Sequence, residues 1–244
     1  MRPKSFRMVV NLAVIAIMSM SLFCVRSVAE ALASGSTKAN TVVTDIPPLV
    51  DVPVWSMATL NDDADQTTNM NLLTYATPVS IRPTRLYALG LFKATKSRDN
   101  FLREKSCILQ LLSGSNQKHI ECVRLLGGTS GKDVPKEKDL VSVHDIELET
   151  LDSNDENESN DHLPKVLPGC VQYIKLSMVG DEVIDYDGGE SSHDVVICKV
   201  DKMWTSVSEE TEGEVNEDHY LSTGYLRELG LITEQGRIAP LPED

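Results

Sequence analysis

Hydroxyl, amide and cationic side chains gather at the ends of apolar segments in the first half of the chain. Hydroxyls, backbone N–H groups and a cation can together hold a phosphate without a Walker-type glycine loop. Amide groups can pair with the nitrogen and oxygen edge of a flat polar ring. This stretch therefore predicts a site for a phosphate and a polar heterocycle. The side chains concerned are Asn69, Asn71, Thr74, Lys93 and Thr95.

The elements that must position these side chains are mostly strands. Apolar runs with β-branched and aromatic residues, separated by turn residues, predict short strands. Ser97 is the predicted N-cap of a first short helix. Many short strands with turns between them favour a barrel or sandwich decorated by helices. The predicted strands are 52–60, 72–80, 86–92, 106–112, 170–179 and 193–203, and the predicted helices are 97–105, 117–126 and 220–229.

Three segments carry a family resemblance. Residues 69–83 (NMNLLTYATPVSIRP) are similar to an Asn/Met/Thr segment that runs into a Ser-Val-Ser-x-x-Pro-Pro turn. The loop with Lys93 and Thr95, followed by Ser97 and Asn100, is similar to a Ser/Thr loop before a helix. Residues 191–200 match the pattern GDHxxxxGxV at its His and last Val, but lack its Asp and its Gly. In this order, over roughly residues 50–205, the chain resembles the flavin reductase-like, FMN-binding split-barrel family.

The resemblance implies a fold, a cofactor and a reaction. It implies a mainly-β FMN-binding split barrel that uses NAD(P)H to reduce flavin or a flavin-linked acceptor, and that forms a homodimer. It places His193 near the flavin as the catalytic residue, where it could orient a nicotinamide or move a proton. The tail at 220–239 resembles an extension of plant and algal members. The cofactor-binding residues that it implies are Asn69, Asn71, Thr74, Tyr75, Ala76, Ser80, Lys93, Thr95 and Asn100.

Two other functions remain open at this point. One is a split barrel that holds flavin or haem without turnover. The other is a cofactor-free barrel that docks a partner through the acidic loop or the last helix. Other classes are disfavoured: a net charge of −14 argues against nucleic acid, the histidines have no metal-ligand spacing, and no G-x-S-x-G or G-x-G-x-x-G motif is present.

The chain divides by composition into a leader, a body and two acidic segments. Residues 1–33 combine a basic start, an apolar run at 8–25 and small residues, which is typical of a cleavable signal peptide. An uncleaved membrane anchor is the alternative, and the Ser/Thr-rich residues 34–44 would fit a two-part leader into a plastid. After a linker at 34–49, the barrel is expected over 50–205, with an acidic insertion at 129–165, an acidic linker at 206–219 and a helix and tail at 220–244.

Four cysteines fall in the body of the chain, and no two of them have CxxC spacing. They could form two disulfides or remain as buried thiols, which behave as small core residues. A body of this size can form a core without disulfides, which favours thiols.

Overall fold

The computed structural model describes residues 49–151, 162–184, 190–205 and 219–240. The leader at 1–33, most of the linker after it, residues 152–161 of the acidic insertion and nearly all of the second acidic linker lie outside the described residues. Within the described part of the chain, no helix is long and apolar enough to cross a membrane.

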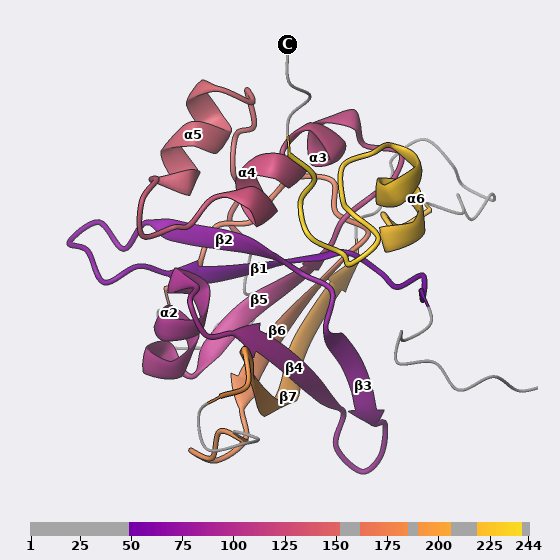
Figure 1. Ribbon diagram of the computed structural model, residues 1–244. Coiled ribbons are helices and arrows are strands. Elements are labelled where there is room, and N and C mark those ends of the chain that lie inside the picture. The colour runs from indigo at the N-terminus through magenta and orange to yellow at the C-terminus, as the bar shows by residue number, and fades with distance from the viewer. Residues whose placement is uncertain (1–48, 152–161, 185–189, 206–218, 241–244) are drawn as a thin grey trace, which may run out of the picture. The chain divides into compact units, whose positions relative to one another are not determined.

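Seven antiparallel strands form one sheet in the order β2-β1-β5-β6-β7-β4-β3. The two edge strands, β2 and β3, are consecutive in the chain and only two residues separate them, so the sheet must curl until its edges meet at that corner. Figure 1 shows the curled sheet, in which β3 follows β2 at this corner and β4 returns antiparallel to β3. The strands are β1 (Trp55–Leu60), β2 (Thr68–Leu73), β3 (Ala76–Ser80), β4 (Leu86–Phe92), β5 (Ser106–Leu111), β6 (Gln172–Met178) and β7 (His193–Thr205).

One predicted strand is two strands in the structure. The sequence analysis expected a single strand over 72–80, whereas β2 ends at Leu73 and β3 begins at Ala76. The link, Thr74–Tyr75, is where the chain crosses from one edge of the sheet to the other. The break is required because β2 pairs with β1 whereas β3 pairs with β4. Strand propensity along the sequence does not show which strands pair, so it cannot predict this break.

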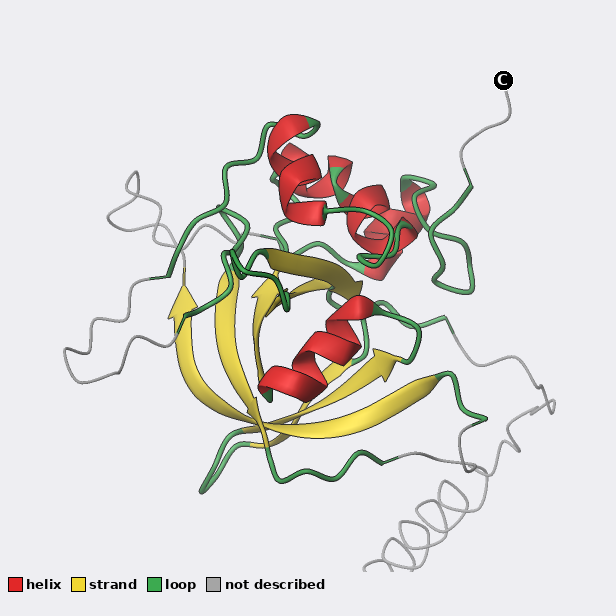
Figure 2. Ribbon diagram, turned by 90° about the vertical axis from the view of Figure 1, so that its left-hand side faces the viewer, coloured by secondary structure: helices red, strands yellow, loops and turns green. Residues whose placement is uncertain are grey.

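Helices cover the sheet in two groups (Figure 2). Helix α2 lies across the mouth of the curled sheet and buries Phe101 completely. The other helices pack on the outer side, where the apolar side chains of β1, β2 and β5 meet residues such as Leu126, Leu140 and Leu226. The helices are α2 (Lys96–Glu104), α3 (Gln117–Glu121), α4 (Val123–Gly128), α5 (Lys136–Ser142) and α6 (Thr223–Glu228).

The C-terminal segment is part of the same core. Backbone hydrogen bonds join Leu221 to Val54 and to Leu112, so residues 220–222 extend the ends of β1 and β5. Leu221 and Leu226 are buried in the outer cluster. This segment follows a charged region that gives no pairing signal, and the sequence analysis expected only a helix and a tail there.

Candidate functional site

Two strand ends meet at the corner where the sheet closes. Phe92, the last residue of β4, pairs with His193, the first residue of β7. The backbone N–H of Gly90 donates to the carbonyl of Tyr75 (2.8 Å), which brings the β2–β3 link beside them. A Cβ on residue 90 would lie 3.0 Å from the Cβ of Tyr75, so glycine allows this close approach.

Three rings form the surface of this corner. The imidazole of His193 lies 5.3 Å from the ring of Tyr75, edge to face, and 5.3 Å from the ring of Phe92. Tyr75 is 63% exposed and Phe92 is 46% exposed, which is unusual for large apolar rings. An exposed aromatic surface with an imidazole between its rings can stack against a flat heterocycle.

His193 has one ring nitrogen in a hydrogen bond and is mainly neutral at pH 7. Its Nδ1 bonds the hydroxyl of Ser192 (2.8 Å), and among the described residues its Nε2 makes no hydrogen bond. Burial lowers the pKa of His193, and the nearby Asp194 carboxylate opposes that shift. A neutral imidazole can accept or donate one proton at Nε2, as proton transfer at this position would require.

Asp194 organises the cations beside the rings. Its carboxylate is buried and accepts from the guanidinium of Arg98 at 2.6 and 2.8 Å, and it lies 3.7 Å from Nζ of Lys93. The ion pairs tie β7 to the loop after β4 and to the first turn of α2. Lys93 keeps a partly exposed ammonium at the corner.

Thr95 begins α2 next to Lys93. Its hydroxyl donates to the carbonyl of Phe92 (2.9 Å) and accepts from the N–H of Arg98, so Thr95 is the N-cap. The cap predicted from the sequence, Ser97, is wrong by two residues. Ser97 lies inside the helix, where its hydroxyl accepts from Nδ2 of Asn69 (2.7 Å). The helix N-terminus carries partial positive charge and unbonded N–H groups, which suits an anion.

The structure brings some of the expected site residues together and separates others. Thr74, Tyr75, Lys93, Thr95 and His193 lie around the corner. Ser80 is at the other end of β3, roughly 15 Å along the strand, where its hydroxyl bonds the carbonyls of Arg82 and Thr84.

Two of the asparagines have structural partners. Asn100 is buried in α2 and donates to Thr59 and Asn61, which fastens the helix to β1. Asn69 is likewise buried, against Ser97. Ala76 lies half-buried opposite Leu89.

The side chain of Asn71 carries a buried acceptor, its Oδ1. Its Nδ2 bonds the carbonyl of Leu72, but its Oδ1 is buried and makes no hydrogen bond with any described residue. Asn71 shares its strand face with Leu73, whose side chain is buried in the same cluster as Leu89 and Phe101. A buried acceptor without a partner costs free energy, and a ligand N–H group would satisfy it. The isoalloxazine ring of FMN carries such an N–H group on its polar edge. The residue types at this corner therefore suit the phosphate and the ring of FMN.

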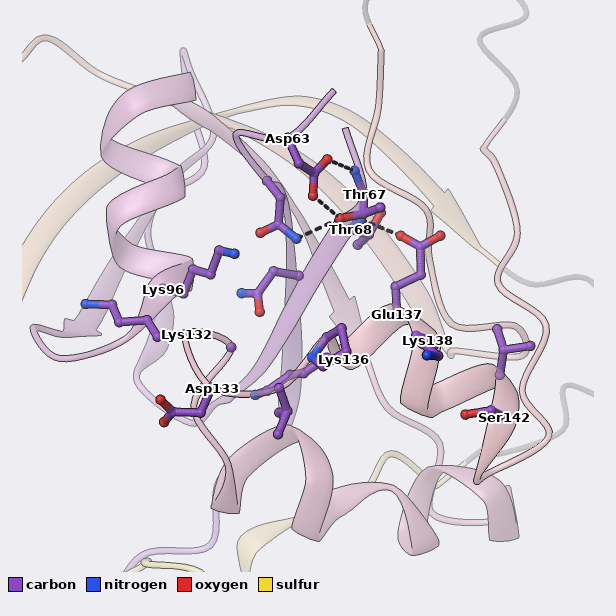
Figure 3. A pocket seen from close by; sticks show the side chains of 16 residues that line it. Asp63, Thr67, Thr68, Lys96, Lys132, Asp133, Lys136, Glu137, Lys138 and Ser142 are labelled. Carbon is purple, nitrogen blue, oxygen red and sulfur yellow. Dashed lines mark hydrogen bonds between the residues drawn. The ribbon is translucent and has the colours of Figure 1, made fainter. Parts of the chain in front are cut away.

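A cleft lies beside the N-terminus of α2 (Figure 3). This cleft of about 590 Å³ is lined by the β1–β2 loop, by Lys96 and by the loop that leads into α5. Of the expected site residues only Asn69 borders it. The sequence analysis missed this cleft, since its walls come from segments far apart in the sequence.

The four cysteines of the body are free and buried, and burial raises the pKa of each thiol. The structure therefore shows buried thiols and not the alternative of two disulfides. The cysteines are Cys107, Cys122, Cys170 and Cys198.

Known structures share this fold. Flavoredoxin from Methanosarcina acetivorans matches with a TM-score of 0.52 at 10% identity, over 75% of this chain and 90% of that one. An FMN-binding protein from Thermus thermophilus gives 0.49 at 16% identity, over 84% and 88% of the two chains. The NADH:FAD oxidoreductase of Streptomyces globisporus gives 0.47 at 11% identity, over 64% and 77%. No protein-family model and no curated protein sequence matches the chain.

The mainly-β split barrel with short helices, expected from the sequence, is confirmed as the fold. At 10–16% identity this similarity shows the fold alone.

Proposed function

We propose that this protein binds FMN at the closing corner of the barrel and acts as an NAD(P)H-dependent oxidoreductase of the flavin reductase type. The observation that carries the proposal is the meeting of a cation, a helix N-terminus, exposed rings and a neutral imidazole at one corner of a split barrel. The similar structures include an FMN-binding protein and an NADH:FAD oxidoreductase, which are proteins of the proposed kind.

The roles follow from what each group can do. Lys93, the hydroxyl of Thr74 and the first N–H groups of α2 would hold the phosphate. Oδ1 of Asn71 would accept from the ring edge, and Tyr75 would pack against the ring. When bound, FMN supplies the hydride chemistry. The chain then has to position the nicotinamide, exclude water and hold a proton at Nε2 of His193.

A fluorescence titration with FMN tests the proposed phosphate contact. Lys93→Ala should weaken FMN binding by about tenfold or more, because a charge-assisted contact contributes roughly 1.5–3 kcal/mol. Lys105→Ala is the matched control, since Lys105 follows the far end of α2 and pairs with the exposed Asp181. Equal affinity in the two variants would remove Lys93 from the site.

A flavin-binding protein without turnover is the second candidate. The observation in its favour is Ser192, a hydroxyl beside His193 where the resembling family has an acid. Both candidates predict bound FMN, and only the first predicts its reduction by NAD(P)H.

We also propose a homodimer. Strand β3 is a sheet edge that exposes Val79 (52%), and the residue after its end, Ile81, is 71% exposed. Exposed apolar edges favour pairing or coverage. Sedimentation should give twice the monomer mass, and Ile81→Lys should shift it towards the monomer. A monomeric wild-type chain at micromolar concentration would contradict the proposal.

The route to the final compartment remains a proposal based on the leader. We propose that the signal at 1–33 directs the chain into the secretory route, with a plastid destination or anchoring in the membrane by residues 8–25 as the alternatives. N-terminal sequencing of the mature chain shows whether residues 1–33 have been removed or retained.

A further inference from the structure

The cleft beside α2 has cationic walls. Lys96, Lys132, Lys136 and Lys138 line it (Figure 3). Its volume of about 590 Å³ lies within the range of roughly 300–1,000 Å³ that is usual for small-molecule sites. The position of these lysines at the rim and on the walls favours a ligand with negative charge.

The carboxylates of the cleft are largely engaged by its own walls. Asp63 accepts from the N–H and the hydroxyl of Thr67. Glu137 accepts from the N–H of Thr68 and from Nζ of Lys165. The third carboxylate, that of Asp133, is on an exposed residue.

The lysines are less engaged than the acids. Lys132 pairs with Asp99 at 2.9 Å. Neither Lys96 nor Lys138 forms an ion pair with a carboxylate in the described part of the chain, although Lys96 is close enough to lower the pKa of Asp63. The positive charges of Lys96 and Lys138 are therefore available to an anionic ligand at the rim of the cleft.

Lys136 differs from the other three. The residue is only 3% exposed, and its Nζ donates to the carbonyl of Leu126 (2.7 Å) in the last turn of α4. Among the described residues this is its one hydrogen bond, and no carboxylate pairs with it. Burial lowers the pKa of Lys136 to about 8. At neutral pH the fraction of free amine is then about two orders of magnitude larger than for an ordinary lysine.

We propose that the cleft binds small anionic aldehydes or ketones and that Nζ of Lys136 forms an imine with their carbonyl carbon. The amine lone pair attacks the carbonyl carbon, the N–C bond forms, and the oxygen leaves as water after accepting the two amine protons. No oxidant or reductant is required. The anionic group of the ligand would face Lys96, Lys132 and Lys138. The proposal does not depend on flavin, because the cleft lies apart from His193 and Tyr75.

Pyridoxal 5′-phosphate serves as a general aldehyde probe. The purified chain is incubated with the probe at pH 7.5, treated with borohydride to fix any imine as a secondary amine, digested, and mapped by mass spectrometry. We expect the label on Lys136 to exceed that on any exposed lysine by about tenfold or more. Pyridoxal, which lacks the phosphate, should label Lys136 several-fold less, and inorganic phosphate should protect it.

Variants and a pH profile complete the test. Lys136→Met should remove the label. Lys118→Met should keep it, because Lys118 is an exposed lysine outside the cleft that pairs with Asp145. Circular dichroism should confirm that each variant is folded. If Lys136→Met does not fold, the wild-type pH profile decides, because labelling should reach half its maximum near pH 8. A label spread over exposed lysines, or a half-maximum above pH 10, would overturn the proposal and leave Lys136 as a cap of α4.

Discussion

At the scale of single residues, His193 connects the strands, the rings and the ion pairs of the corner. Its Nδ1 is occupied by Ser192 and its Nε2 is available, which fixes the nitrogen that can meet a ligand. Asp194 beside it is buried but fully paired with Arg98 and Lys93. The imidazole is therefore oriented by Ser192, while the carboxylate holds the cations.

His193→Gln should separate binding from turnover. Glutamine keeps a polar side chain of similar size, so FMN affinity should change by less than about threefold. Reduction by NADPH should slow by about tenfold or more, because the group that orients the nicotinamide or holds the proton is gone. Stopped-flow absorbance measures the rate and fluorescence the affinity; an unchanged rate would exclude His193 from the reaction.

Asn71→Ala tests the acceptor that has no donor. In the apo protein the change removes an unsatisfied buried oxygen, so the melting temperature should move little. FMN should bind the variant about three- to tenfold more weakly if the ring edge donates to Oδ1. Thermal shift with and without FMN measures both effects, and equal shifts in variant and wild type would contradict the role.

The sequence predicted which residues gather at the corner better than it predicted what each one does. Lys93, Thr95 and His193 meet because each lies at the end of a strand or helix that the apolar pattern reveals. Ser80 and Asn100 have the expected residue types, but the structure uses their polar groups in a hairpin and in a helix contact. Tertiary partners of this kind do not appear in a single sequence.

At the scale of elements, α2 connects the corner and the cleft. Thr95 caps it on the corner side, Lys96 lines the cleft, and Ser97 bonds Asn69 of β2. The rigid placement of this N-terminus is therefore required by both sites.

Thr95→Ala should destabilise the fold by about 1 kcal/mol, the usual effect of losing an N-cap hydroxyl. It should also weaken FMN binding, because the first N–H groups of α2 become less ordered. Thr95→Ser keeps the hydroxyl and is the control that should behave like wild type. Urea denaturation of the three proteins measures the free energy of unfolding, and equal midpoints would show that the cap contributes nothing.

Two helices show where local patterns fail. Residues 136–142 form α5 inside the segment that was expected to be an insertion, and Leu140 is buried there. Residues 117–126, expected as one helix, form α3 and α4 with a break at Cys122. In both places short segments are ordered by contacts with the outer core rather than by their own periodicity.

At the scale of the whole molecule, the succession of strands along the chain was predictable, and the way in which they close into a barrel was not. Five of the strands match the expected segments closely, since alternating and apolar runs are local signals. The closing corner depends on pairing between β4 and β7, which are about 100 residues apart. The C-terminal segment pairs with the ends of β1 and β5, which are likewise far from it in the sequence.

His119 should make stability depend on pH. Its Nδ1 accepts from the N–H of Ser113 (3.0 Å), so Nε2 carries the proton and faces the carbonyl of Pro168 (2.9 Å). Burial lowers the pKa of His119 below its usual 6.5. As the pH falls, His119 is therefore protonated in the unfolded chain before it is protonated in the folded one. Its contribution to the free energy of unfolding is fully present above pH 6.5 and decreases as the pH drops towards the pKa of the folded state.

The expected slope for this one proton is up to about 1.4 kcal/mol per pH unit. Urea unfolding at pH 5.0 to 7.5 measures it, and His119→Gln should reduce the slope by that amount while lowering stability overall. An equal slope in the variant would assign the pH dependence to other groups.

The most direct test of a flavin-binding oxidoreductase is an absorption spectrum of the mature chain after incubation with FMN and desalting, recorded before and after anaerobic NADPH. We predict retained flavin bands that bleach when NADPH is added. Bands that stay would contradict the reductase function and favour flavin binding without turnover. A colourless protein would contradict the cofactor site itself and leave only the split-barrel fold.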